Sequence, residues 1–108
     1  MSKISIQDET NMFKNITEQM LKTFIQKRND YGQTTEETFK RFGPISLYVR
    51  MFDKMGRLEN LFTNKKCIHV KDETVEDTLL DLANYCIITI IEMTKQKCEV
   101  IDNEEIHR

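Results

Sequence analysis

Turn-forming residues are scarce in this chain, which has 3 glycines and 1 proline among 108 residues. A fold of many short strands needs frequent turns, and turns depend heavily on Gly and Pro. The sequence also lacks regular alternation of apolar and polar residues. These absences predict a few long helices. The 39% hydrophobic and 31% charged residues are typical of a globular chain.

A charge excess of one sign and a pattern of paired cysteines are missing as well. The net charge is −2, so no dominant basic face supports binding to duplex nucleic acid. The cysteines are odd in number, widely spaced and without a CxxC pair, so they do not form a disulfide framework. They fit a reducing cytoplasm. They are Cys67, Cys86 and Cys98.

Long hydrophobic runs are also lacking. The most apolar stretch, residues 79–91, is interrupted by Asp81, Asn84 and Thr89. It is shorter than the roughly 20 residues that span a bilayer. The N-terminus is polar and unlike a signal peptide. We therefore expect no membrane partner and a cytoplasmic location, in the host cell if the protein is viral.

Apolar residues at three- and four-residue spacing predict an all-α fold, a compact bundle of about four helices, three long and one short. The expected helices span 7–29, 34–43, 44–62 and 74–95. Residues 1–95 then form a single domain. Residues 96–108 form a charged C-terminal tail that we expect to be frayed or loosely docked.

Local signals set the expected ends of these helices. Gly32 is a natural stop for the first helix, and Thr34 can begin the second with a capping box. Gly43 ends the second helix, and Pro44 suits the first turn of the third. Thr74 can cap the fourth helix.

The third and fourth helices differ in their apolar faces. The third has one predicted apolar face, made of Tyr48, Met51, Phe52, Met55, Leu58 and Phe62. The fourth is apolar around nearly its whole circumference, which predicts burial on almost every side. Three other helices in so short a chain leave part of it uncovered. We therefore expect a homodimer or homotetramer that buries the rest.

A polar stripe crosses the fourth helix. Asp77, Asp81 and Asn84 stand at positions i, i+4 and i+7, within roughly 60° of one another. A carboxylate near a core needs compensation, either from a protein cation or from a bound metal. A structural reading makes Asp81 a partner of Arg50 or Arg57, and Asp77 a helix-dipole residue.

A mixed-charge stripe on the third helix suits a functional reading. Asp53 and Arg57 could simply support each other on a solvated face. If the stripe packs against the fourth helix, Asp53 joins Asp77 and Asp81 as ligands for Mg²⁺. Arg50, Lys54 and Arg57 would then bind phosphate oxygens. Acids for metal beside cations for phosphate are typical of a nucleotide polyphosphate site.

Asp30 and Tyr31 precede Gly32 at the expected end of the first helix. There the tyrosine ring could stack on a base and the carboxylate could accept a base N–H. An ordinary helix-terminating turn is the alternative interpretation of the same three residues.

Three segments carry a family resemblance: DYG at 30–32, GPISLYVRMFDKMGRLENL at 43–61 and VKDETVEDTLLDLANYCIITIIE at 70–92. Together they resemble the nucleotide modification associated domain family, type one, of phages and bacteria. The resemblance covers roughly Phe24 to Glu92. The matching positions are Asp30, Tyr31, Gly32, Arg50, Asp53, Lys54, Arg57, Asp72, Glu73, Glu76, Asp77, Asp81, Asn84 and Tyr85.

That family is similar in layout to the MazG-like all-α nucleoside triphosphate pyrophosphohydrolases. The resemblance implies helical carboxylates that hold Mg²⁺, with Glu73 and Glu76 added to the metal set, and a dimer or tetramer. It also implies a nucleotide-binding role for Asn84 and Tyr85. Glu73 and Glu76 match the ExxE half of the MazG signature. Only Glu99 and Asp102, in the expected tail, match the ExxD half after it.

Three functions are compatible with the sequence. The first is a Mg²⁺-dependent hydrolase-like domain that acts on nucleoside polyphosphates in phage nucleotide metabolism. The second is a non-catalytic sponge that sequesters cyclic dinucleotides or related nucleotide signals of host anti-phage defence. The third is a structural or regulatory helical oligomer. Binding and hydrolysis use the same cations and acids, so the sequence names no catalytic residue.

Overall fold

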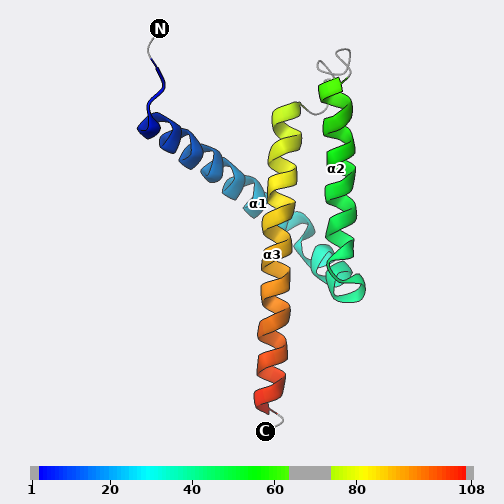
Figure 1. Ribbon diagram of the computed structural model, residues 1–108. Helices are drawn as coiled ribbons and strands as arrows, with labels where there is room; N and C mark the ends of the chain where they lie inside the picture. The colour runs from blue at the N-terminus through cyan, green and yellow to red at the C-terminus, as the bar shows by residue number, and fades with distance from the viewer. Residues whose placement is uncertain (1–2, 64–73, 107–108) are drawn as a thin grey trace. The chain divides into compact units, whose positions relative to one another are not determined.

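The computed structural model describes residues 3–63 and 74–106, excluding the side chains of residues 30, 31 and 101–106. Its elements are α1 (Ile6–Phe42), α2 (Ile45–Thr63) and α3 (Val75–Ile106) (Figure 1). The all-α prediction is confirmed. No helix in the described ranges is long and apolar enough to cross a membrane.

The capping predictions at Gly43 and Thr74 are confirmed. The Gly43 N–H donates to the Phe39 carbonyl (2.7 Å), and φ is 74° at Gly43, the left-handed conformation that favours glycine after a helix. The Asp77 N–H donates to Thr74 Oγ1 (3.0 Å), and the Thr74 N–H donates to Asp77 Oδ2 (3.4 Å). Thr74 therefore caps α3, with Asp77 as the reciprocal acceptor.

The predicted break at Gly32 is wrong, because α1 continues through it to Phe42. Thr34 therefore lies inside this helix and does not cap a new one. A glycine inside a helix costs only about 1 kcal/mol relative to alanine. Residues 7–42 contain no proline to force a break. The short second helix is therefore the end of α1.

The predicted end of the last helix at residue 95 is also wrong. α3 continues to Ile106 and takes in most of the segment expected to be a loose tail. A contact holds the first turn of this extension, where Lys40 Nζ lies 3.9 Å from Glu99 Oε1. The weak apolar periodicity after residue 95 therefore does not indicate where this helix ends.

The chain divides into two compact units, Met1–Gln33 and Thr34–Arg108. Within the first unit, α1 carries the predicted apolar stripe at helical spacing. Met20 and Phe24 are half-buried, while Phe13, Ile16 and Ile25 are exposed. A single helix with an apolar stripe has no second element of its own unit to cover it.

In the second unit, α2 and α3 lie side by side and antiparallel (Figure 1). The buried apolar residues that the structure describes are Phe39, Leu47, Leu58 and Leu61. Of the predicted apolar face of α2, only Leu58 is buried, and Tyr48, Phe52, Met55 and Phe62 are exposed. The sequence predicts that the more apolar side of α2 faces the core. α2 instead packs through leucines interleaved with basic residues.

Candidate functional site

The two polar stripes meet between α2 and α3. Lys54 Nζ of α2 lies 3.1 Å from Asp81 Oδ2 of α3, and the two side chains are only 23% and 20% exposed. The two stripes come together at this pair, whereas Asp53 and Asp77 are exposed. The compensating charge beside Asp81 includes Lys54, where the structural reading had named Arg50 or Arg57.

Arg50 and Arg57 lie one turn to either side of Lys54 and are half-buried. The Nε atom of Arg57 is inaccessible to solvent. Residues spaced i, i+4 and i+7 share one helix face, which is also the side of Leu47 and Leu61. The three cations therefore lie along the packed side of α2, where charges interact more strongly than in bulk water.

Asn84 continues the stripe on α3. It is 7% exposed, and Thr78, two turns before it, is fully buried. The Thr78 hydroxyl donates to the Thr74 carbonyl (2.9 Å), so the helix itself satisfies it. Tyr85 is half-buried beside Asn84. We call Arg50, Lys54, Arg57, Asp81 and Asn84 the α2–α3 polar wall.

The residues predicted to hold a metal are not gathered in the described part of the chain. Asp77 is exposed and caps α3, Glu76 is exposed beside it, and Asp53 is exposed on α2. No three Asp, Glu, His or Cys side chains in the described ranges are placed to share a metal ion. Glu73, the remaining predicted ligand, lies outside the described residues. The Mg²⁺ site that the sequence predicted therefore stays a prediction.

Asp30, Tyr31 and Gly32 lie within α1 and form no turn, so the predicted base-stacking position at a helix end is wrong in its geometry. The side chains of the first two lie outside the described part. A Cβ on Gly32 would stand 3.0 Å from Arg28 Cγ, so the glycine leaves room for that side chain.

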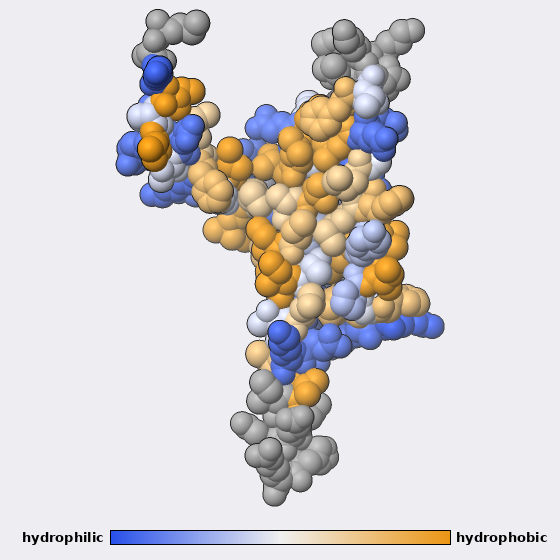
Figure 2. Space-filling model, in the orientation of Figure 1, coloured by the Kyte–Doolittle hydropathy of each residue, from blue (hydrophilic) through white to orange (hydrophobic). Residues whose placement is uncertain are grey.

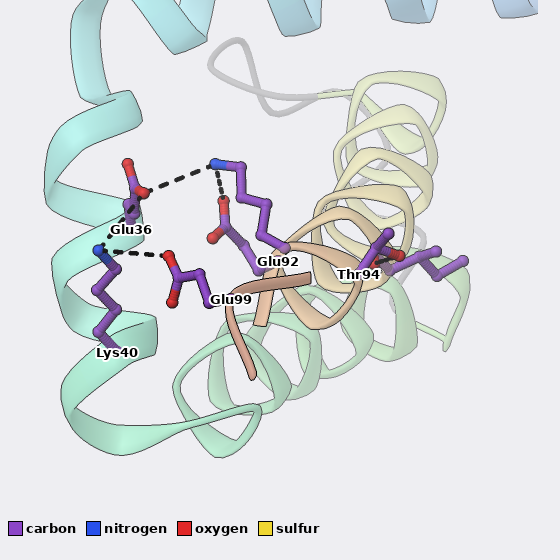
Figure 3. Close-up of polar contacts among 7 residues, drawn as sticks. Glu36, Lys40, Glu92, Thr94 and Glu99 are labelled. Carbon is purple, nitrogen blue, oxygen red and sulfur yellow. Dashed lines mark hydrogen bonds and ion pairs between the residues drawn. The ribbon is translucent and has the colours of Figure 1, made fainter. Parts of the chain in front are cut away.

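A second polar cluster, which the sequence reasoning missed, joins the end of α1 to α3 (Figure 3). Lys95 Nζ lies 3.1 Å from Glu92 Oε1 and 4.0 Å from Glu36 Oε1. Lys40 Nζ lies 3.8 Å from Glu36 Oε1 and 3.9 Å from Glu99 Oε1. Glu92 is 3% exposed, and the Lys95 ammonium group lies beside this buried carboxylate.

The same cluster lines a cavity of about 180 Å³, together with Phe39 and Gln96. One signal could have revealed it. Glu92 interrupts an apolar run eleven residues, or about three helical turns, after Asp81. A charge at that spacing continues the polar stripe of α3. In this structure the network lies between the last turns of α1 and α3.

Comparison with known proteins gives one match. A family model described as nucleotide modification associated domain 1 matches residues 27–93. The matched region includes all of α2 and the whole polar wall. Neither the curated proteins nor the solved structures gave a match. The likeness to MazG-like enzymes therefore stays a prediction.

Proposed function

Because the chain belongs to the nucleotide modification associated domain 1 family, we propose that it binds a nucleotide through its phosphate groups on the α2–α3 polar wall. The observation that carries this proposal is the contact between Lys54 Nζ and Asp81 Oδ2 at 3.1 Å. That contact fixes the basic side of α2 against the polar stripe of α3.

The chemistry of the wall suits a phosphate group. Guanidinium groups form paired hydrogen bonds with phosphate oxygens, and a lysine adds a compact positive charge. Arg50 and Arg57 are half-buried and flank Lys54. Packing that restricts these long side chains before binding lowers the entropy lost on binding.

Base recognition would come from the same wall. The side-chain amide of Asn84 offers both donors and an acceptor, which can match the edge of a base. Asn84 is 7% exposed and Tyr85 beside it is half-buried. An aromatic ring at this position can stack on a base. Asp30 and Tyr31 stay candidates for the same role.

Sequestration without turnover is the finer form of the proposal that the geometry favours. Lys54 already lies beside Asp81, and a lysine in that position competes with a divalent cation for the carboxylate. Such a binder would sequester a cyclic dinucleotide or a related phosphate-bearing signal of host anti-phage defence.

Mg²⁺-dependent hydrolysis of nucleoside polyphosphates is the second candidate. It is favoured by Glu76 and Asp77, which are exposed within about one turn of Asp81. Carboxylates near bound phosphates are the usual ligands of Mg²⁺, together with water. Under this candidate, Mg²⁺ would bind with the nucleotide.

A thermal-shift screen of nucleoside triphosphates and cyclic dinucleotides, with and without Mg²⁺, tests the proposal. A ligand at 100 times its Kd stabilises the fold by about 2.7 kcal/mol, so binding raises the Tm measurably. Mass spectrometry of the recovered ligand separates the two candidates. An intact ligand supports sequestration, and released pyrophosphate or phosphate supports hydrolysis.

A pair of variants ties any binding to the wall. Arg50→Gln removes a half-buried wall cation, whereas Lys97→Gln removes an exposed cation elsewhere on α3. We expect about a tenfold or greater loss of affinity for the first, since hydrogen bonds to charged groups contribute about 1.5–3 kcal/mol. Equal affinities in the two variants, or no Tm shift with any ligand, would refute the proposal.

A further inference from the structure

The outer side of α2 carries an uncovered apolar stripe. Its members each leave more than half of their surface exposed, and they are Ile45, Tyr48, Val49, Phe52, Met55 and Phe62. They recur at helical spacing along the whole of α2, away from the buried Leu47, Leu58 and Leu61. We call them the outer stripe. Figure 2 shows apolar surface spreading over the α2–α3 pair in one view.

The area of the outer stripe is that of a protein interface. Large side chains of this kind present roughly 150–250 Å² each. At a little over half exposure, about 100 Å² per residue gives about 600 Å² of contiguous apolar surface. That is the upper end of what a typical monomer exposes in one patch. A standard interface covers about 800 Å² per partner, of which somewhat over half is apolar.

Four members of the outer stripe have the same spacing in both chain directions. Ile45, Phe52, Met55 and Phe62 are separated by seven, three and seven residues. Reversing the helix about its midpoint, between residues 53 and 54, places Ile45 opposite Phe62 and Phe52 opposite Met55. A twofold interface needs such self-complementarity, because each copy presents the same surface to the other.

A polar pair near the centre of the stripe fits the same arrangement. Reversal places Tyr48 opposite Glu59, which is exposed on α2. A tyrosine hydroxyl can donate to a carboxylate across the interface. The Tyr48 and Phe52 rings already lie together, with centroids 6.5 Å apart.

We propose that the outer stripe of α2 pairs antiparallel with the outer stripe of a second copy of this chain, across a twofold axis near residues 53 and 54. The dimer covers the side of α2 opposite the polar wall, so it does not cover the wall. The pairing is independent of whether the wall binds a nucleotide.

Complementary charges at one predicted contact test both the face and its register. Phe52→Glu and Met55→Lys each place a charge in the apolar interface, and both positions are exposed within a single chain. Each variant alone should have the mass of a monomer, 12.9 kDa, by light scattering after gel filtration. Mixed in equal amounts, they place the new carboxylate opposite the new ammonium group, and the mass should double.

Val100→Glu is the matched control, because Val100 is about as exposed on α3 but lies outside the outer stripe. It should leave the dimer mass unchanged. Far-UV circular dichroism on the same samples follows folding. Recovery of mass and helicity in the mixture supports the proposal even if the single variants lose helicity.

Three results would overturn it. The first is a wild-type chain that stays monomeric at concentrations up to about 100 times a micromolar Kd, where a stable dimer is saturated. The second is a Phe52→Glu variant that keeps the dimer mass. The third is a mixture of the two charged variants that fails to form a dimer, since the register then differs from the proposed one.

Discussion

Breaking the Lys54–Asp81 pair should destabilise the second unit while leaving its helices intact. Lys54→Met removes the ammonium group and leaves the Asp81 carboxylate, which is only one-fifth exposed. Asp81→Asn removes the opposite charge and leaves the lysine in the same packed environment. Each single substitution therefore leaves one charge largely removed from water, beside a partner that no longer offsets it.

The expected loss of stability follows from the exposure of the Lys54–Asp81 pair. Exposed pairs contribute about 0–1 kcal/mol, whereas breaking a fully buried pair costs about 3–5 kcal/mol. At one-fifth exposure we expect each single substitution to lower the free energy of unfolding by about 2 kcal/mol. The double variant removes both charges and should lose less than the sum, with a coupling energy of about 1–2 kcal/mol.

Urea unfolding at fixed chain concentration, followed by far-UV circular dichroism, gives the free energies of unfolding of the wild type, the two single variants and the double variant. Lys40 and Glu99 provide the control, because their side chains are 59% and 58% exposed. Their coupling should stay below about 1 kcal/mol and vanish in about 1 M salt, where the screening length is about 3 Å. A Lys54–Asp81 coupling no larger than the control, or lost in that salt, would refute the reasoning.

Three further predictions concern single positions. The Ser5 backbone N–H, and to a smaller extent its hydroxyl, hold the pKa of Asp8 below its ordinary value. The ionised carboxylate therefore stabilises the fold at pH values above the ordinary pKa. This stabilisation is lost as the pH falls through the lower pKa of the folded state. Ser5→Ala removes the hydroxyl and keeps the backbone N–H, so NMR titration should show this pKa return part of the way toward its ordinary value, and an unchanged pKa would contradict the contribution of the hydroxyl. Gly56→Ala should raise the free energy of unfolding by about 1 kcal/mol, because a Cβ there meets nothing within 4 Å; a decrease in urea melts would contradict it. Leu47→Ala, at 1% exposure, should lower that free energy by about 2–5 kcal/mol, and a loss under about 1 kcal/mol would indicate that α2 does not pack on this side.

The polar wall shows how much of a site the local sequence pattern can predict. The spacing of Asp81 and Asn84 predicts that they share one face of α3, and the spacing of Arg50 and Lys54 predicts the same for α2. Their meeting depended on how α2 and α3 pack. The cluster around Lys95 was missed, because Lys95 contacts Glu36 of α1, more than fifty residues earlier in the chain.

The sequence by itself determined the helical class of the protein and the helix ends at Gly43 and Thr74. Gly43 and Thr74 act through atoms within about one turn, so their roles follow from neighbouring residues alone. Only the tertiary structure decided that α2 packs through Leu47 and Lys54 and leaves Phe52 outside. The physical reason is that a charged side chain can be buried once a distant residue offsets its charge, whereas an apolar stripe carries no information about which surface covers it.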